Sequence, residues 1–330
     1  MAKRTPRIRV EGRTKLQDVI PLKTPLHVFI DPSAACNFKC GFCFHADPKN
    51  AHHEIMKWET FTKAVDQLKQ FPGKLKAVRL YGFGEPLLNR RLPEMVKYTK
   101  DAGVTDFVEF TTNGWWLNPD LNRKLIDAGL DAITISIPGL YNADIQESCG
   151  HDVDFQNYYE NIVDLCMVKQ KCRVHVKMTN NNLQDGDIIL FETLFEDIAD
   201  EISIDNIVPI WPGLEKTVGL VVNPTKNIYN LPLDKVSVEV CPYIFYHLTI
   251  HANGDISTCF VDWKHQNILG NVNTDTLFDV WNGAKLRAMR IHHLQGDRKL
   301  YPLCKNCTQL TYGQPDNIDP YADEIFERMI

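Results

Sequence analysis

The stretch "DPSAACNFKCGFCFHADPKN", residues 31–50, holds three cysteines within eight positions. Cys36, Cys40 and Cys43 follow a C-x3-C-x2-C spacing, directly after what its apolar residues predict to be a buried strand. Three thiolates are an incomplete set, because zinc sites and ordinary iron–sulfur sites usually have four protein ligands. The motif therefore predicts a metal site in which something other than cysteine fills one place.

The composition is that of an ordinary globular protein, with 330 residues, 44% hydrophobic and 24% charged. This length allows one large α/β domain with a smaller appendage. No apolar run could span a membrane, and the basic start "MAKRTPRIRVEGRTK" lacks the apolar core of a secretory signal, so we expect a cytoplasmic protein. A net charge of −6 argues against nucleic acid as the main partner.

The ten cysteines point to metal binding or redox chemistry rather than to disulfides in such a chain. The four late ones are Cys241, Cys259, Cys304 and Cys307. Four thiolates complete either a zinc site or a fully ligated iron–sulfur cluster, and the spacing leaves both open. Cys166 and Cys172 lie in or after a helix-like segment and are explained by burial.

Apolar runs alternate with amphipathic stretches over residues 25–212. The strands predicted from this pattern are 27–36, 77–84, 107–112, 132–139, 173–178 and 204–211. The helices predicted between them are 58–71, 90–103, 118–129, 155–170 and 187–200. Such alternation predicts an α/β fold with a parallel sheet, because parallel strands need crossover connections. Six strands cannot close an eight-stranded barrel, so a doubly wound sheet or an open partial barrel remains.

Polar motifs follow successive predicted strands. They are the triple cysteine, "GFGEP" at 82–86, "TTNG" at 111–114 and "SIPG" at 136–139. Ligands of both fold types bind beyond the carboxyl ends of parallel strands. The motifs therefore predict one ligand site along this edge of the sheet.

Four regions are expected along the chain. They are a basic, frayed extension at 1–25, the α/β domain at 26–214, a connector at 215–240 and a small domain at 241–330. Short strands are expected within 245–260, with a hairpin turn at Asn253-Gly254, and one helix at 276–291.

The early motif resembles the signature of the radical S-adenosylmethionine (SAM) superfamily, C-x3-C-x-aromatic-C, with Phe42 as the aromatic before Cys43. In that family three cysteines hold a 4Fe–4S cluster, and the amino and carboxylate groups of SAM chelate its open iron. The reduced cluster cleaves SAM to a 5′-deoxyadenosyl radical, which abstracts a hydrogen atom from the substrate. The resemblance implies a partial (β/α)6 barrel over most of residues 27–212.

The resemblance also implies SAM contacts. Gly84 and Glu85 match the segment that holds the methionyl amino group, although Phe83 replaces the first glycine of the commoner form. Asn113 and Ser136 match polar positions that contact the SAM carboxylate and ribose. The full set of implied SAM-binding residues is Phe42, Gly84, Glu85, Pro86, Asn113 and Ser136. Pro138 stands where many relatives carry an aspartate.

The late segment resembles the SPASM/twitch extension of radical SAM enzymes, in "CPYIFYHLTIHANGDISTCFVD", "LFDVWNG" and "CKNC". The complete SPASM module carries more cysteines and a second cluster. The four cysteines here suit the twitch form, with one auxiliary 4Fe–4S cluster as electron acceptor or structural support. The resemblance further implies an external electron donor such as flavodoxin or ferredoxin.

Among related enzymes the chain looks most like aminocyclitol and carbohydrate dehydrogenases. Only about 25 residues precede the first strand, so the peptide-recognition module of peptide-modifying relatives is not expected. The expected activity is two-electron oxidation of a carbinol carbon in a small carbohydrate or aminocyclitol. The alternatives are a redox-neutral epimerase, a peptide-modifying enzyme such as a maturase, and a zinc-binding interaction protein.

Several residues are candidates for the substrate chemistry. Cys149, in the predicted loop "ESCGHDVDF", could return a hydrogen atom to the substrate in an epimerase. Asp262 and Asp255 are carboxylates that could accept a proton in a dehydrogenase. His45, His52 and His53 follow the cysteine loop and could line the substrate cleft, and His45 would complete a three-cysteine zinc site.

Overall fold

Ten strands form one sheet in the order β1-β7-β6-β5-β4-β3-β2-β8-β9-β10. The computed structural model describes residues 2–4, 12–180, 183–212, 214, 225–233, 237–313 and 316–330. The strands are β1 Lys3–Arg4, β2 His27–Ile30, β3 Ala77–Arg79, β4 Val108–Thr112, β5 Ala132–Ile137, β6 Arg173–Thr179, β7 Glu201–Asp205, β8 His247–Ile250, β9 Asp255–Ser257 and β10 Gly270–Asn271.

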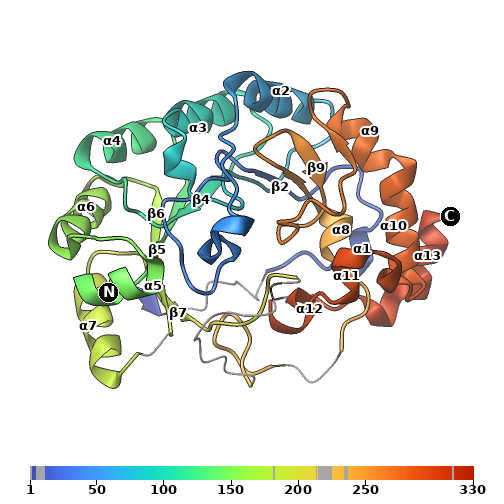
Figure 1. Ribbon diagram of the computed structural model, residues 1–330. Coiled ribbons are helices and arrows are strands. Elements are labelled where there is room, and N and C mark those ends of the chain that lie inside the picture. The colour runs from blue at the N-terminus through green and yellow to red at the C-terminus, as the bar shows by residue number, and fades with distance from the viewer. Residues whose placement is uncertain are drawn as a thin grey trace.

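Helices follow most of these strands and form an arc outside the sheet (Figure 1). In the first domain they are α1 Leu16–Val19, α2 Trp58–Leu68, α3 Leu92–Asp101, α4 Pro119–Asp127, α5 Asn142–Cys149, α6 Phe155–Val168 and α7 Asp185–Phe195. Later in the chain they are α8 Tyr243–Tyr246, α9 Leu277–Asn282, α10 Ala284–Leu294, α11 Pro302–Lys305, α12 Gln309–Tyr312 and α13 Ala322–Met329. None of the helices described is both long and apolar enough for a bilayer crossing.

Strands β2 to β7 are parallel and lie side by side in chain order. A doubly wound sheet would reverse its strand order part-way, whereas chain order throughout is the winding of a (β/α) barrel. The predicted α/β class is therefore confirmed, and of the two architectures left open the partial barrel is the one observed.

The two faces of this sheet differ in polarity, as β4 illustrates. Val108 and Phe110 are fully buried against the outer helices, while Glu109 and Thr111, which alternate with them, are partly exposed. Because successive side chains of a strand point to opposite faces, Glu109 and Thr111 face the inside of the barrel. Along β4 the barrel therefore has an apolar outer face and a polar inner face.

The C-terminal part of the chain extends the same sheet. Strand β8 pairs in parallel with β2, in register from His27 opposite His247 to Ile30 opposite Ile250. Strand β9 returns antiparallel to β8 through the predicted Asn253-Gly254 turn, where Gly254 has φ +91°. The predicted hairpin is confirmed, but the sequence did not indicate that it would pair with the first strand of the barrel.

Several predicted elements were wrong in their bounds. The strands predicted at 27–36 and 77–84 end at Ile30 and Arg79, because the chain leaves the sheet there for the cysteine loop and the "GFGEP" segment. The sixth barrel strand is Glu201–Asp205 rather than 204–211, because "EISID" carries the alternation and Pro209 has no N–H for a ladder. The segment 276–291 forms two helices, α9 and α10, instead of one. They break at Gly283, where an added Cβ would lie 2.6 Å from the Asp279 carbonyl oxygen.

The terminal and connecting segments also differ from expectation. Part of the extension is a strand, because Lys3–Arg4 pairs in parallel with β7; residues 1 and 5–11 lie outside the described residues. Residues 142–149, which include part of the predicted loop around Cys149, form helix α5. Of the connector, residues 215–224 and 234–236 are outside the described part, and the rest contains an isolated bridge between Lys226 and Pro232.

Replacing His247 by phenylalanine should change how stability depends on pH. His247 is 1% exposed, and burial together with the Arg79 charge lowers its pKa to about 3. A depressed folded-state pKa gives stability that is present above the unfolded value of 6.5 and lost as the pH falls towards 3. Each pH unit by which the pH falls in this window should lower the unfolding free energy by about 1.4 kcal/mol. The His247→Phe variant should lack this pH-dependent contribution.

Denaturant unfolding at about pH 7 and about pH 5.5 measures this difference. Other buried histidines, such as His27 and His251, add to the common trend, so the variant is compared with the wild-type protein at both pH values. His53→Gln, on an exposed loop, is the control. Equal pH dependence in the wild type and His247→Phe would contradict the prediction.

Candidate active site

The three early cysteines lie in a loop that follows β2 at the carboxyl edge of the sheet. The loop rests on the end of helix α5, because the Lys39 N–H donates to the Cys149 carbonyl (2.8 Å) and the Gly41 N–H to the Ser148 carbonyl (3.2 Å). Within the loop, the Cys43 N–H donates to the Cys40 carbonyl (2.8 Å). The backbone thus fixes the spacing of the cysteines without using their sulfur atoms.

Burial governs the acidity of these thiols. It raises the pKa of Cys36 to about 12, with the Glu85 carboxylate adding to the effect, and the pKa of Cys43 to about 11. Thiolates are the metal-binding form, so a group bound here must supply positive charge that compensates for burying three thiolates. An iron–sulfur cluster meets that requirement.

The "GFGEP" segment packs against this loop so closely that its glycines are required. A Cβ on Gly84 would lie 2.2 Å from the Ala35 carbonyl oxygen and 2.4 Å from that of Ser33, while the Glu85 N–H donates to Ala35 (2.8 Å). A Cβ on Gly82 would lie 2.6 Å from the carboxyl carbon of Asp31. The contact clamps the end of β3 onto the cysteine loop.

Asp31 was missed by the sequence analysis. It is fully buried and accepts hydrogen bonds from the Ser33 and Phe83 N–H groups, both at 3.3 Å, and burial raises its pKa to about 7. The only signal in the sequence was an aspartate directly after an apolar strand. Its carboxyl group ties the beginning of the cysteine loop to "GFGEP".

Glu85 links the ends of β3 and β4. Its carboxylate accepts from the Thr112 hydroxyl (2.6 Å), the Asn113 N–H (2.7 Å) and the Leu87 N–H (2.9 Å), and burial raises its pKa to about 7. Pro86 is buried at the start of the turn Pro86–Leu88. Of the implied SAM-binding residues, the structure therefore gathers Gly84, Glu85, Pro86 and Asn113 around one point.

Asn113 reaches the cysteine loop directly. Its side-chain amide donates to Oδ1 of Asn37 (2.9 Å), and its carbonyl accepts from the buried Tyr158 hydroxyl (2.6 Å). The Nδ2 of Asn37 is buried and has no hydrogen-bond partner. An orphaned donor beside Cys36 fits an acceptor such as a carboxylate or a cluster sulfide, so the site suits the implied groups.

The two remaining implied SAM-binding residues lie at the rim of this group. Ser136 is on the inner face of β5, opposite Lys177 in the register, and is half-exposed. Phe42 is half-exposed in the cysteine loop. Their contacts with SAM stay predictions.

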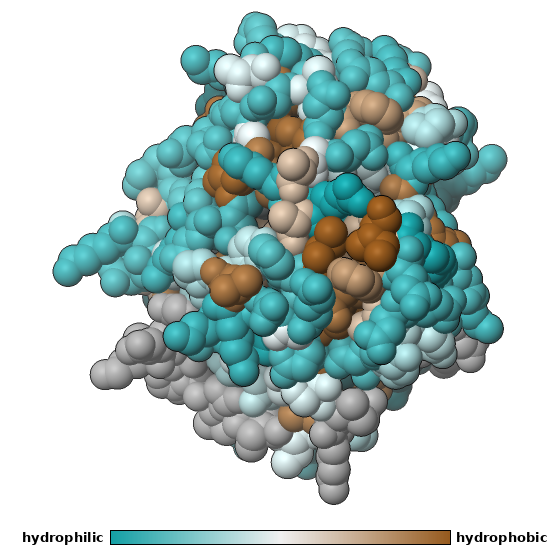
Figure 2. All heavy atoms as spheres, turned by 90° about the vertical axis from the view of Figure 1, so that its right-hand side faces the viewer, coloured by the Kyte–Doolittle hydropathy of each residue, from teal (hydrophilic) through white to brown (hydrophobic). Residues whose placement is uncertain are grey.

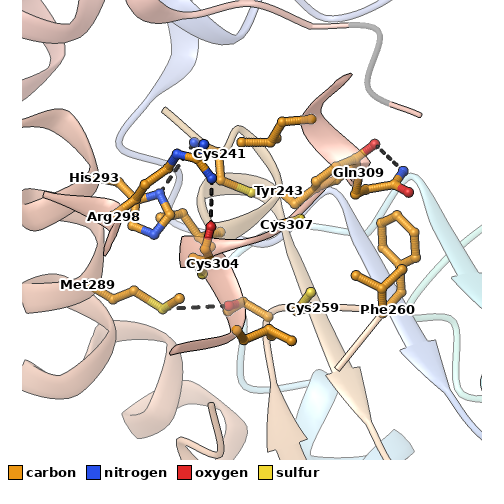
Figure 3. A pocket seen from close by; sticks show the side chains of 15 residues that line it. Cys241, Tyr243, Cys259, Phe260, Met289, His293, Arg298, Cys304, Cys307 and Gln309 are labelled. Carbon is orange, nitrogen blue, oxygen red and sulfur yellow. Dashed lines mark hydrogen bonds between the residues drawn. The ribbon is translucent and has the colours of Figure 1, made fainter. Parts of the chain in front are cut away.

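The four late cysteines surround a single cavity (Figure 3). Cys241 precedes α8, Cys259 follows β9, Cys304 lies in α11 and Cys307 follows it, and all four line this cavity. Burial raises the pKa of Cys304 to about 12 and those of the other three above their usual value. This convergence of residues 66 positions apart fits a group with four thiolate ligands.

Within the described residues, no three His, Cys, Asp or Glu side chains converge closely enough to hold a single metal ion. A 4Fe–4S cube spans several ångströms and takes one thiolate at each iron, so its ligands do not need to meet at one point. His45, the proposed fourth ligand of a zinc site, donates through Nε2 to the Phe83 carbonyl (2.9 Å).

The candidates for substrate chemistry occupy different environments. Cys149 is the last residue of α5, is fully buried, and its thiol donates to the Ile145 carbonyl (3.0 Å). Asp262 is fully buried, and its two oxygens accept the Gln266 and Asn267 N–H groups, each at 2.8 Å. Asp262 therefore holds a turn together. The burial expected for Cys166 and Cys172 is confirmed, at 7% and 4% exposure.

Aromatic and histidine side chains fill the space between the two cysteine sites. Phe44, next to Cys43, stacks on Trp263 at 5.1 Å and meets Trp211 edge-on at 4.9 Å. His52 donates to the Trp263 carbonyl (2.7 Å) and stacks on His265 at 5.5 Å. His265 in turn bonds the Asp255 carboxylate (3.2 Å).

These histidines and Asp255 form part of the contact between the two domains. His53 is exposed.

Comparison with known proteins agrees with this arrangement. A model of the radical SAM superfamily matches residues 30–191, and a model of the SPASM iron–sulfur cluster-binding domain matches residues 241–308. The chain is a member of the radical SAM superfamily. The two family models thus give this radical SAM protein SAM and iron–sulfur clusters as cofactors, with one cluster in its SPASM domain.

Curated relatives match different lengths of this radical SAM protein. It is 35% identical over 119 residues to a probable GTP 3′,8-cyclase of Sulfolobus acidocaldarius, which is 36% of each chain. The protein thus spans about a third of the length of that relative. It is 22% identical over 318 residues to the tungsten-containing aldehyde ferredoxin oxidoreductase cofactor-modifying protein of Pyrococcus furiosus, covering 86% of this chain and 87% of that one.

Solved structures share the fold at low identity. BtrN in complex with AdoMet and 2-DOIA superposes with a TM-score of 0.56 and 18% identity, covering 89% of this chain and 97% of BtrN. Streptococcus suis SuiB bound to precursor peptide SuiA gives a TM-score of 0.65 and 19% identity, covering 92% and 76%. Native anSMEcpe with bound AdoMet gives 0.62 and 14%, covering 92% and 96%.

Replacing Gly84 by alanine should destabilise the site. The new methyl group would overlap the Ala35 and Ser33 carbonyl oxygens, and overpacking of this kind costs about 1–3 kcal/mol. Gly186→Ala in α7 is the matched control, because a Cβ there meets nothing within 4 Å and alanine favours a helix. Thermal unfolding measures the stability of both variants, and equal melting temperatures would contradict the close contact at Gly84.

Removing the early thiols should remove one cluster. We expect about eight irons per chain in anaerobic wild-type protein and about four in the Cys36/Cys40/Cys43→Ala variant. Only the wild type should release 5′-deoxyadenosine from SAM with dithionite, and only its EPR signal should change on addition of SAM. A matched variant, Cys166→Ala, should behave as the wild type. Retention of SAM cleavage in the triple variant would refute the assignment.

Proposed function

We propose that this protein is a radical SAM dehydrogenase that oxidises a carbinol carbon of a small, polar substrate, a carbohydrate or an aminocyclitol. The observation that carries the proposal is the set of polar side chains on the inner wall of the barrel. This wall ends at the carboxyl edge of the sheet, where the early cysteine loop lies. The four-cysteine cavity in the second domain supports the two-electron outcome, since such an oxidation needs an electron acceptor.

The site residues take the following roles in the proposal. Cys36, Cys40 and Cys43 hold the first cluster, and Cys241, Cys259, Cys304 and Cys307 hold the second. Glu85 and Asn113 orient SAM, with the free amide of Asn37 as a further donor. When bound, these groups supply a 5′-deoxyadenosyl radical and an acceptor for the second electron.

The inner wall presents paired charges and hydroxyl groups. Arg79 bonds Glu109 (2.6 Å), and Lys177 bonds Asp205 (2.8 Å) with side chains only 10% and 3% exposed. His175 and the Ser203 hydroxyl lie 2.9 Å apart on neighbouring strands. An apolar substrate would desolvate these groups without replacing their hydrogen bonds, whereas a polyhydroxylated one can bond to them. The wall therefore selects polar substrates.

Two alternatives predict different products. A redox-neutral epimerase needs a hydrogen donor, and Cys149 is the candidate because its carbonyl already contacts the cysteine loop at Lys39. A peptide-modifying enzyme is suggested by the likeness to SuiB and anSMEcpe, which extends to the fold alone. The names of the curated relatives, a GTP cyclase and a cofactor-modifying protein, favour a small molecule.

A substrate panel tests the proposal. Cyclitols, aminocyclitols and sugars are compared with Ser- and Cys-containing peptides for stimulation of 5′-deoxyadenosine release from SAM under dithionite. We expect stimulation by a polyol, and a product that lacks two hydrogen atoms in the mass spectrum. A product of unchanged oxidation state that carries solvent deuterium and needs Cys149 would establish the epimerase instead. Stimulation by peptides alone would overturn the proposal.

Variants of the inner wall sharpen the test. Lys177→Met and Ser203→Ala should lower substrate-stimulated release about tenfold or more, equivalent to about 1.4 kcal/mol. Substrate-independent SAM cleavage should change less, because Lys177 and Ser203 lie on β6 and β7 whereas the cysteine loop follows β2. Lys97→Met, which breaks an exposed pair with Asp101, is the control.

A further inference from the structure

One of the late cysteines has a side-chain hydrogen-bond donor on its sulfur atom. The Nδ2 of Asn267 lies 3.6 Å from the Sγ of Cys304, within the range of N–H···S bonds, and Asn267 is 9% exposed. An N–H donor in this position stabilises negative charge on the sulfur. The amide therefore points at the sulfur atom of Cys304, which lines the cavity.

Asp262 fixes the position of this donor. Its carboxylate accepts the Asn267 N–H and the Gln266 N–H (each 2.8 Å), and its carbonyl accepts the His265 N–H (3.1 Å). The side chain and the backbone carbonyl of the buried Asp262 thus both accept hydrogen bonds that close the turn from 262 to 267. The backbone of Asn267 is held in place before any group binds, so placing its side-chain amide costs less conformational entropy.

Other donors surround the same cavity. Tyr243 and Ile244, at the start of α8, and Gln309 and Leu310, at the start of α12, line this cavity beside Cys241 and Cys307. Arg298 donates to the Cys304 carbonyl (2.6 Å) and pairs with Glu239 (3.0 Å). The cavity is lined with hydrogen-bond donors and with the positive charge of Arg298, while Asp262 is engaged by backbone N–H groups.

We propose that Asn267 is a positioning residue that raises the reduction potential of the cluster held by the late cysteines. Hydrogen bonds to ligating sulfurs stabilise the reduced state, which carries one more negative charge, and so favour the uptake of an electron. The inference rests on the proposed function, in which this cluster accepts the second electron of the oxidation. It assigns Asp262 the role of holding the Asn267 donor, in place of proton acceptor.

A potentiometric EPR titration of the anaerobic holoenzyme tests the proposal. The titration is run in the full chain and in the Cys36/Cys40/Cys43→Ala background, where the late cluster alone contributes. At the wild-type midpoint potential, Asn267→Leu should lower the ratio of reduced to oxidised cluster about tenfold, which is about 59 mV for one electron. Asn267→Gln keeps an amide donor and should restore part of the shift.

Asn282→Leu, in an exposed position at the end of α9, is the matched control and should leave the ratio unchanged. Asn267→Asp keeps the size of the side chain, lacks the N–H and adds negative charge. It should therefore lower the ratio of reduced to oxidised cluster at least as far as Asn267→Leu does. If the leucine variant loses iron, the aspartate variant tests the proposal in its place. A wild-type ratio in Asn267→Leu, or in Asn267→Asp, with the late cluster intact overturns the role of Asn267. Absence of a second cluster in the wild type overturns the cluster assignment itself.

Discussion

The close contact between the end of β3 and the cysteine loop is the constraint on which the rest of the site depends. At Gly84 two stretches of backbone approach so closely that no side chain fits between them. Glu85 then reaches across to the end of β4 and Asn113 returns to the cysteine loop through Asn37. Polar groups from three successive strand ends are thereby locked into one constellation, with buried donors and acceptors that satisfy one another except at Asn37.

The sequence was sufficient for the features that depend on local pattern. Period-two and helical alternation located the β2 to β6 strands and their helices, and the motifs after each strand located the site, because parallel strands place their carboxyl ends together. The cysteine spacings and the neighbouring "GFGEP" were specific enough to indicate the family. These predictions follow from residues that act through their own neighbours in the chain.

What the sequence did not reveal depends on the folded geometry, both between distant segments and within single turns. The pairing of β8 with β2 places residues 27 and 247 opposite each other, and the sequence of neither strand indicates which strand it pairs with. The burial of Asp31 and Asp262 is likewise set by turns that only the folded chain closes, so Asp262 could be taken for a proton acceptor. Gly283 breaks a helical pattern because of its fit against the preceding turn, which a periodicity analysis does not detect.

The pairing of β8 with β2 also bears on whether the barrel can exist without the C-terminal domain. If the chain were cut before Cys241, β2 would become the edge of the sheet, with an apolar "VFI" run and unpaired N–H and C=O groups along it. Exposed edges of this kind pair with other chains and aggregate. The SPASM domain thus protects the barrel from self-association. A barrel of this sequence could gain or lose such a domain only by acquiring another cover for that edge.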